Sequence, residues 1–323
     1  MNNMNIIDMH CDTLCNLTLS DKGMKLYSND GEISIEKLQK GGSLAQFFAI
    51  FIPTHNGETK PIPDAAYDFY KRALGVFQRE MEENKEFIAP ALCYNDIIKN
   101  KSENKMSAIL TIEDSVPADG KLDRITEFYN DGVRLMTLTW NYENSLGFPN
   151  SKDPELMAKG LKPFGIEAVQ KMNELGIIVD VSHLSDGGFN DVAKYTNKPF
   201  VASHSCCRAL CSHQRNLTDD MLKTLGNKGG VVGINFCASF LNDNANYTDI
   251  DSVVKHMLHI KDKAGIDALG FGSDFDGIGS KLEFKDYSGM PMIVDALTKH
   301  FKDDEIDKIC SGNMLRIIKE NLG

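Results

Sequence analysis

The motif Asp8-Met-His10-Cys-Asp12 directly follows the apolar residues Ile6 and Ile7 near the N-terminus. On an extended strand, side chains alternate between the two faces, so His10 and Asp12 are expected to project to the same side. One imidazole and one carboxylate on the same side of a strand make half of a metal site. The other half must come from His, Asp or Glu residues elsewhere in the chain.

Four further residues of these types each end a separate apolar, strand-like run. They are Glu113, His183, His204 and Asp274. Imidazole nitrogens and carboxylate oxygens are ligands suited to Zn²⁺. A single zinc ion bound by five such ligands would have no position left for substrate, so two zinc ions fit the set better.

In a site with two zinc ions, Glu113 is expected to bridge the metals. His10 and Asp12 would complete the site of one ion, and His183 and His204 that of the other. Two such ions would acidify a shared water to a pKa of about 7, which makes it a nucleophile at neutral pH. Asp274 remains as the base that takes the water proton and passes it to the leaving amine.

Each of these residues alone has a simpler interpretation. A histidine after a strand is often only hydrogen-bonded at the rim, Glu113 could cap the next turn, and Asp274 could cap a helix. Their joint occurrence at the ends of several strands favours a metal site. The remaining histidines are interpreted as surface or structural residues: His55, His213, His256, His259 and His300.

Strand-like and helix-like segments alternate along the whole chain of 323 residues. This pattern predicts a single domain, residues 1–323, with the α/β fold of a (β/α)8 TIM barrel and extra C-terminal helices. An open doubly wound sheet is the alternative. The predicted strands are Ile6–His10, Ser43–Pro53, Ser107–Glu113, Val133–Trp140, Ile177–His183, Pro199–His204, Val231–Cys237 and Ala268–Asp274.

Helices are predicted between the strands, and polar residues follow several of the strands. In a barrel the carboxyl ends of the strands meet at one rim, where catalytic groups converge. Two long loops at this rim, 141–160 and 238–248, are either pocket walls or mobile surface loops. The predicted helices are 64–84, 122–129, 164–175, 218–226 (capped by Thr218 or Asp219) and 251–264, with two more within 292–322.

Composition narrows the functional classes. The net charge of −11 argues against nucleic acid or an anionic membrane as the main partner. We find neither a signal peptide nor an apolar run long enough to span a bilayer, so a cytoplasmic location is expected. The eight cysteines form no paired pattern and are expected to be reduced.

These motifs together resemble the membrane (renal) dipeptidase family of zinc metallopeptidases. The resemblance runs from residue 6 to about residue 280, and the motifs keep their order. It is carried by Asp8-x-His10-x-Asp12, Thr111-Ile-Glu113, Val179-Asp180-Val-Ser182-His183, Ala202-Ser-His204-Ser205, Gln214-Arg215-Asn216-Leu217 and Gly270-Phe-Gly-Ser-Asp274-Phe-Asp276-Gly277.

The resemblance implies a barrel with two zinc ions that hydrolyses dipeptides and tolerates a D-residue on the C-terminal side of the scissile bond. It assigns the five metal ligands as above, and Asp274 as the acid and base. It also implies that Arg215 binds the terminal carboxylate of the substrate, a role suited to a planar guanidinium. A homodimer is suggested by the resemblance alone.

Two positions depart from the family. Trp140 stands where renal-type enzymes have a histidine thought to polarise the substrate carbonyl or stabilise the oxyanion. The indole N–H of Trp140, or the amide of Asn141, could donate one hydrogen bond there instead. Asp114 replaces a glycine of the family. Either its negative charge tightens metal binding, or Asp114 is only a turn residue.

The leading hypothesis is a cytoplasmic, zinc-dependent dipeptidase whose substrate carboxylate lies on Arg215. Trp140 and Asp114 motivate an alternative, a related metal-dependent hydrolase of another amide, a cyclic amide or a lactone. A third hypothesis, a protein that binds metal or peptide without catalysis, leaves Asp274 without a role.

Overall fold

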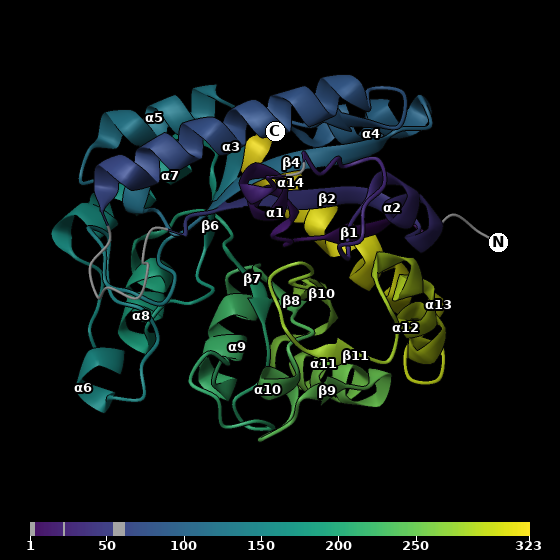
Figure 1. Ribbon diagram of the computed structural model, residues 1–323. Coiled ribbons are helices and arrows are strands. Elements are labelled where there is room, and N and C mark those ends of the chain that lie inside the picture. The colour runs from purple at the N-terminus through teal and green to yellow at the C-terminus, as the bar shows by residue number, and fades with distance from the viewer. Residues whose placement is uncertain (1–3, 22, 54–61) are drawn as a thin grey trace.

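A ring of parallel strands forms the centre of the computed structural model, which describes residues 4–21, 23–53 and 62–323 (Figure 1). Among these residues the ring closes because β2 pairs with β4 and β10 pairs with β1. The (β/α)8 barrel is therefore confirmed, and the open doubly wound sheet is wrong. The strands of the ring are β1 (Ile6–Asp8), β2 (Ser43–Phe51), β4 (Met106–Glu113), β5 (Val133–Thr137), β6 (Ile178–Asp180), β7 (Val201–Ser205), β8 (Val231–Ile234) and β10 (Leu269–Phe271).

Several strands end earlier than the sequence predicts. Strand β1 ends at Asp8 and β6 at Asp180, so His10 and His183 lie beyond them rather than within them. The reason is visible at Asp180, whose carboxylate accepts hydrogen bonds from the backbone N–H groups of Ser182 and Ser203 at 3.0 and 2.8 Å. A side chain that takes these N–H groups ends the regular pairing of the strands.

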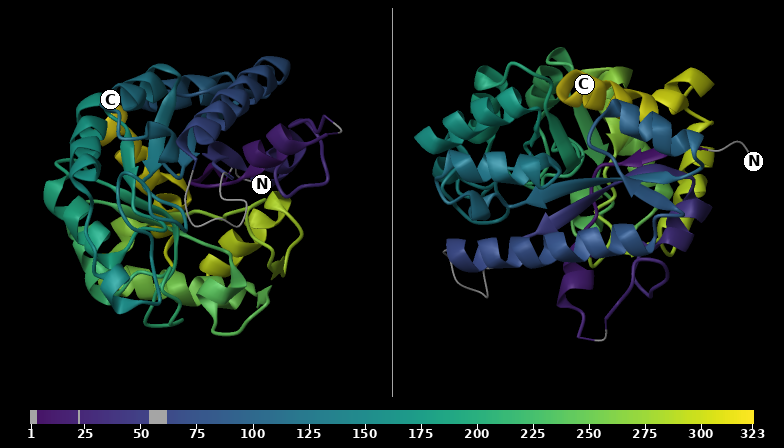
Figure 2. Two further views of the ribbon diagram at one scale, coloured as in Figure 1. Left: turned by 60° about the vertical axis from the view of Figure 1, so that its left-hand side comes forward. Right: turned by 90° about the horizontal axis from the view of Figure 1, so that it is seen from above.

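Helices surround the ring of strands on the outside (Figure 2). They begin with ordinary signals: Pro63 is in the first turn of α3, and Thr218 caps α9 by accepting the N–H of Met221. No helix in the described ranges is both long and apolar enough to cross a membrane. The helices are α1 (Thr13–Leu19), α2 (Ile35–Gly41), α3 (Pro63–Glu83), α4 (Tyr94–Ser102), α5 (Leu122–Asn130), α6 (Pro154–Met157), α7 (Pro163–Leu175), α8 (Asp186–Tyr195), α9 (Asp219–Asn227), α10 (Ala238–Leu241), α11 (Ile250–Ala264), α12 (Met290–Leu297), α13 (Asp303–Asp307) and α14 (Asn313–Leu322).

Some short elements were not predicted from the sequence. Strand β3 (Ile88–Pro90) pairs with the first residues of β4, and β9 (Tyr247–Thr248) pairs with β11 (Lys281–Leu282). Short 3₁₀ helices cover Val116–Ala118, Ile266–Ala268 and Tyr287–Gly289, and a π-helical turn covers Lys308–Gly312. The C-terminal region is thus more divided than the two predicted helices.

The core of the barrel is sealed at one end by α14. Its side chains Met314, Ile317 and Ile318 pack with residues that point into the barrel, among them Phe47 and Leu135. Strand β4 is buried along its whole length, as expected for a strand covered on both faces. Helix α14 thus closes the amino-terminal end of the strands, and the pocket lined by Glu113 and His183 lies at the opposite end.

Candidate metal centre and active site

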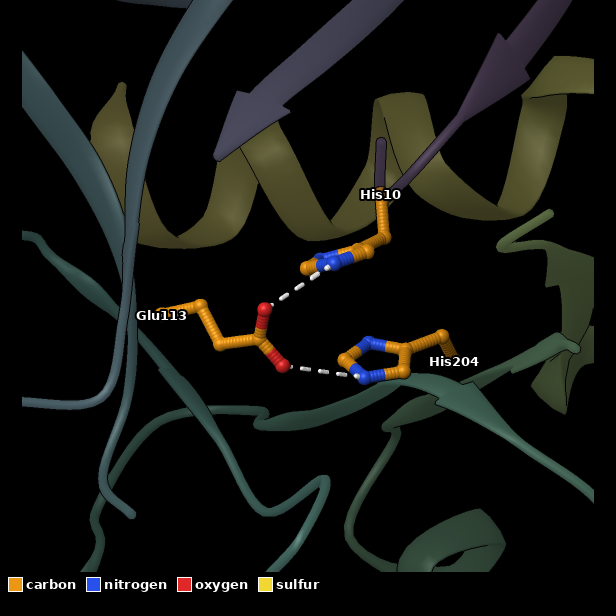
Figure 3. Close-up of side chains that lie close together, drawn as sticks. All are labelled: His10, Glu113 and His204. Carbon is orange, nitrogen blue, oxygen red and sulfur yellow. Dashed lines mark ion pairs between the residues drawn. The ribbon is translucent and has the colours of Figure 1, made fainter. Parts of the chain in front are cut away.

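Six side chains predicted from the sequence converge at the carboxyl-terminal end of the barrel. They come from five separate loops or strands, and Figure 3 shows Glu113 between two of them, His10 and His204. Its Oε2 lies 3.4 Å from Nε2 of His10, whereas its Oε1 lies 3.0 Å from Nε2 of His183 and 3.4 Å from Nε2 of His204. The two oxygens of one carboxylate therefore face two different sets of histidine nitrogens.

The second group of carboxylates surrounds His10. Its Nε2 lies 3.6 Å from Oδ2 of Asp12 and 3.7 Å from Oδ1 of Asp274. Asp12 caps α1 by position, but its side chain makes no capping hydrogen bond to that helix. The predicted reason for this pairing, a common strand, is wrong because β1 ends at Asp8. His10 and Asp12 meet instead because the chain turns directly from β1 into α1.

The hydrogen bonds made by Nδ1 of His183 and of His204 fix the tautomers of the two rings. Ser203 Oγ donates its hydrogen to Asp180 Oδ2 at 2.5 Å, so it accepts a hydrogen bond from the Nδ1–H group of His204 at 2.7 Å. His183 Nδ1 lies 3.1 Å from Oδ1 of Asn141, which is also an acceptor. Both rings therefore carry their proton on Nδ1 and present an Nε2 lone pair to the site.

This donor set fits a bound cation. The two Nε2 lone pairs face each other at 3.0 Å, and Glu113 Oε1 adds a third acceptor. His10 Nε2 and Asp12 Oδ1 are buried without a hydrogen-bond partner among the described residues. Two imidazole lone pairs buried beside the carboxylates of Glu113 and Asp12 are unfavourable unless a positive charge lies among them. Nitrogen and oxygen donors of this kind suit zinc.

The effects of charge and burial on the pKa values also favour a bound cation. Burial raises the pKa of the Glu113 carboxyl to about 8 and that of Asp274 to about 6, and the neighbouring Asp12 carboxylate contributes to both. Burial lowers the pKa of His183 and His204 well below the usual value, and nearby His10 and Arg215 add to this. A cation would favour the ionised carboxylates and the neutral imidazoles at once.

Two of the converging residues have backbone conformations that L-residues rarely adopt. The φ angles of His183 and Asp274 are +67° and +65°, in the left-handed region. Unusual backbone of this kind is concentrated at functional sites, where the surroundings hold it in place. Here it turns the chain sharply after the strands, so that both side chains point into the mouth of the barrel.

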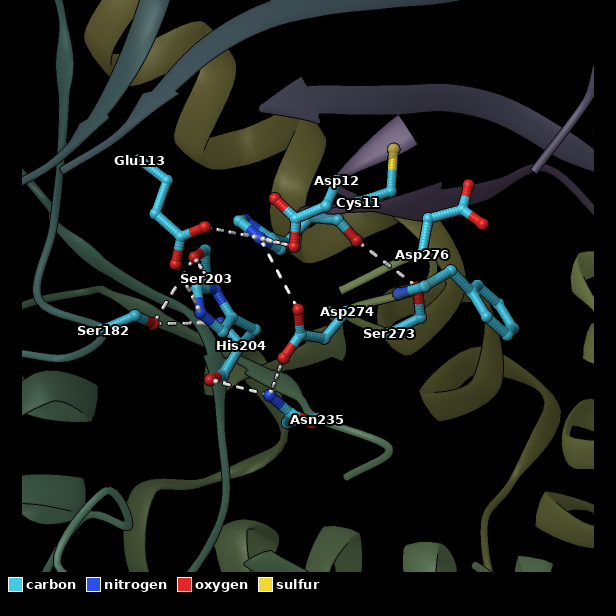
Figure 4. A network of polar contacts seen from close by, with 12 residues as sticks. Cys11, Asp12, Glu113, Ser182, Ser203, His204, Asn235, Ser273, Asp274 and Asp276 are labelled. Carbon is cyan, nitrogen blue, oxygen red and sulfur yellow. Dashed lines mark hydrogen bonds and ion pairs between the residues drawn. The ribbon is translucent and has the colours of Figure 1, made fainter. Parts of the chain in front are cut away.

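Asp274 is held by a residue that the sequence analysis missed. Asn235 donates from Nδ2 to Asp274 Oδ2 at 2.8 Å (Figure 4). The other oxygen, Oδ1, lies 3.7 Å from Nε2 of His10. Asn235 is completely buried and its Oδ1 accepts the N–H of Cys237 at 2.6 Å. Its position directly after β8 could have identified it from the sequence, because the candidate site residues lie at the carboxyl ends of the neighbouring strands.

Arg215 lies beside the converging residues and is almost fully buried. Its Nη1 donates to Ser205 Oγ at 2.8 Å and its Nη2 to the carbonyl of His204 at 2.9 Å. Its Nε has no hydrogen-bond partner among the described residues. A buried guanidinium with an unused donor is suited to an anionic ligand.

The two departures from the resembled family have different surroundings. Trp140 lines the pocket above the candidate metal ligands, and its ring meets that of Phe51 edge-on at 4.9 Å between ring centres. Asp114 is buried with φ +70°, and its Oδ1 accepts a hydrogen bond from Asn144 at 2.9 Å. Asp114 therefore adopts a left-handed backbone conformation that is typical of glycine. Its side chain also holds the loop that contains Asn144.

A pocket of about 380 Å³ opens above the convergent side chains. Its wall includes residues from both long loops, such as Asn141 and Phe240. Backbone hydrogen bonds hold the first loop against the barrel, since Asn150 N donates to His183 O at 2.7 Å. In the part of the chain that is described, both loops act as pocket walls.

The remaining histidines are mostly structural. His256 is buried and His259 pairs with Asp219 at 2.7 Å, whereas His300 is exposed. His55 lies outside the described residues. His213 is half-buried, accepts the backbone N–H of Arg215 and lines a pocket next to that residue.

Comparison with known proteins gives a consistent result over the whole chain. Residues 1–322 match the family model described as membrane dipeptidase (peptidase family M19). An uncharacterized dipeptidase of Schizosaccharomyces pombe is 31% identical over 88% of this chain and 71% of its own length. Dipeptidase tcpJ of Claviceps purpurea is 28% identical over 90% of this chain and 69% of its own length.

Solved structures are similar as well. The crystal structure of dipeptidase AC, a metallopeptidase of family M19, superposes with a TM-score of 0.90 at 26% identity and covers 100% of both chains. A metallopeptidase from Rhodobacter sphaeroides, bound to a phosphinate mimic of L-Ala-D-Ala, has a TM-score of 0.88 at 25% identity and covers 98% of this chain and 99% of its own.

Proposed function

The chain belongs to the membrane dipeptidase family, peptidase family M19, and is a metallo-dipeptidase; from this premise we propose that it uses two zinc ions bridged by Glu113. In this proposal His10 and Asp12 complete one metal site, and His183 and His204 complete the other. Asp274 is the general acid and base. The substrates are free dipeptides, including those with a D-residue at the C-terminal position.

The arrangement of Glu113 carries this proposal. One oxygen of its carboxylate faces His10, and the other faces His183 and His204. A carboxylate that served one ion would not divide its oxygens between two groups of donors. Paired metal ions in hydrolytic sites lie about 3.5–4 Å apart, a spacing that one carboxylate can bridge.

The proposed chemistry assigns a separate task to each side chain. When bound, the two zinc ions would lower the pKa of a water molecule in the site and polarise the substrate carbonyl. Asp274 Oδ1 would accept the proton of the attacking water and later deliver it to the nitrogen of the leaving amine. Asn235 holds the other oxygen of this carboxylate, so that Oδ1 keeps its direction toward the site.

Arg215 would hold the substrate by its terminal carboxylate. Its buried guanidinium lies behind His204, and its free Nε donor supports this role. The similarity to an enzyme crystallised with a mimic of L-Ala-D-Ala supports acceptance of a D-residue at the second position. Trp140 and Asn141 border the same pocket and are proposed to contact the substrate near the scissile bond.

A direct test combines metal analysis with a substrate panel. Protein loaded with zinc should contain two ions per chain and should release amino acids from L-L and L-D dipeptides, but not from tripeptides or carboxyl-amidated dipeptides. Asp274→Asn should keep both ions and lose at least ~10²-fold in kcat, the lower range for general acid–base catalysis. Asp295→Asn, at an exposed position of α12, is the matched control. One ion per chain, or normal turnover by the Asp274 variant, would contradict the proposal.

The place of Trp140 favours a second candidate, a related hydrolase of another amide, a cyclic amide or a lactone. Its indole occupies the pocket wall where the resembled enzymes have a histidine. Arg215 separates the two candidates, because only a substrate with a free carboxylate needs it. Replacement of Arg215 by Met should raise the KM for a dipeptide, whereas hydrolysis of a neutral amide or lactone would continue.

A further inference from the structure

A second pocket, of about 490 Å³, adjoins the metal pocket on the side of Arg215. The two pockets share Asn141, His183 and Phe240 as lining residues. A dipeptide with its terminal carboxylate on Arg215 would therefore direct the side chain of its C-terminal residue into this second pocket. The volume lies within the usual range for small-ligand pockets.

The lining of the second pocket is positively charged, although the protein as a whole is acidic. Its described lining includes two permanent cations, Lys152 and Arg215, and no acidic residue. The metal pocket, in contrast, is lined by several carboxylates, and the chain as a whole carries a net charge of −11. A local concentration of positive charge on an acidic protein attracts anions to that place.

Fixed contacts hold the uncharged polar groups of this pocket in position. His213 accepts the backbone N–H of Arg215 on its Nδ1 at 3.2 Å, so its Nε2 carries the proton. Its ring packs against Phe240 at 4.7 Å between ring centres. Burial lowers the pKa of His213, and the positive charges of Arg215 and Lys152 add to this effect. At neutral pH the ring is therefore an N–H donor rather than a third cation.

The segment with Lys152 is also well anchored. Asn150 donates to the carbonyl of His183 from its backbone at 2.7 Å and from its side chain at 3.1 Å. Pro149 forms a backbone bridge with Leu184 on the same loop as His183. Lys152 is thus carried by a segment that is fixed to a metal-ligand loop, even though its side chain is exposed.

We propose that this pocket selects dipeptides whose C-terminal residue has an acidic side chain. The inference rests on the proposed function, in which Arg215 takes the terminal carboxylate. Arg215 is then occupied, and the second carboxylate, that of an aspartate or glutamate side chain, meets Lys152 and the N–H of His213. A neutral side-chain amide of the same shape interacts less favourably with the positive charge of Lys152 than a carboxylate does.

The test compares isosteric substrates. The zinc-loaded enzyme is assayed with L-alanyl-glutamate and L-alanyl-glutamine, each with the L- and the D-form of the second residue. We expect kcat/KM for the glutamate substrate to exceed that for the glutamine substrate by about fivefold or more, mainly through KM. The ratio should collapse in Lys152→Met, fall below one in Lys152→Glu, and stay as in the wild type in Lys159→Met, a control on the same loop.

Each outcome has one meaning. Equal kcat/KM values for glutamate and glutamine substrates in the wild-type enzyme would overturn the selection of acidic side chains and leave the dipeptidase proposal intact. A preference that survives in Lys152→Met would also overturn it, because the charge would then act from elsewhere. If no dipeptide of the panel is hydrolysed by protein with two bound zinc ions, the proposed function itself fails.

Discussion

Gly277 leaves space that the metal centre needs, so Gly277→Ala should damage catalysis without unfolding the protein. A Cβ atom at this position would lie 1.9 Å from Oδ2 of Asp12 and 2.7 Å from Oδ1 of Asp274, whereas real Cβ atoms essentially never approach closer than 3.0 Å. The carboxylate of Asp12 would have to move by about 1 Å. Displacements of this size at a reacting centre cost about 10²-fold in rate.

The conflict arises from the added methyl group and not from the backbone. The φ angle of Gly277 lies outside the left-handed region, so an L-residue can adopt its conformation. Gly279 lines the same pocket, but a Cβ atom there would meet nothing within 4 Å. Gly279→Ala is therefore the matched control, with the same chemical change two residues away.

The assay measures kcat and KM for a dipeptide, zinc content and melting temperature for the wild type and both variants. We expect Gly277→Ala to lose about 10²-fold in kcat/KM and to bind the ion next to Asp12 more weakly, with a folded circular dichroism spectrum. Gly279→Ala should behave like the wild type. A Gly277→Ala enzyme with full zinc content and normal kcat/KM would refute the assignment of Asp12 and Asp274 to the reacting centre.

Three further predictions concern the surroundings of the site. Asn235→Ala should lower kcat about tenfold or more with little change in KM, because among the described residues Asn235 is the side chain that donates a hydrogen bond to Asp274. Equal losses of kcat for a substrate with a better leaving group would argue against a positioning role. Removal of zinc by a chelator should lower the melting temperature, and re-addition of zinc should restore it. The reason is that an ion at 1,000 times its Kd stabilises the native state by about 4 kcal/mol. Calorimetry of the zinc-bound and zinc-free forms checks this. Burial lowers the pKa of His256 from 6.5 to about 4, so the neutral ring stabilises the native state above pH 6.5 and this contribution declines toward pH 4. In urea unfolding of the metal-free protein, the stability difference between wild type and His256→Gln should therefore shrink by about 2 kcal/mol from pH 7 to pH 5, and a constant difference would contradict this.

Sequence patterns were sufficient for the barrel because the strands and helices are locally encoded. Strand β4 shows this: eight consecutive buried residues end in Glu113, and the run could be read without knowing any partner strand. The order of the strands then follows from parallel neighbours joined by helices. The same reasoning placed His204 and Glu113 at one rim, because their strands run in the same direction.

The sequence did not reveal contacts that join distant segments. Asn235 could not be linked to Asp274, nor could Asn141 to His183, because these pairs are separated by 39 and 42 residues and neither has a local pattern. The short strand β3 was also missed, since three residues carry no periodicity.

By itself, the sequence determined which residue types stand at the ends of which strands, and so the class of chemistry that the barrel can perform. Tertiary structure decided how those groups face one another. Only after the ring closes does Glu113 divide its two oxygens between His10 and the pair His183 and His204. Likewise, only the folded loop brings Lys152 and Arg215 to one pocket. The physical reason is that backbone propensity acts over a few neighbouring residues, whereas electrostatic contacts depend on atoms that the chain brings together only when the barrel is complete.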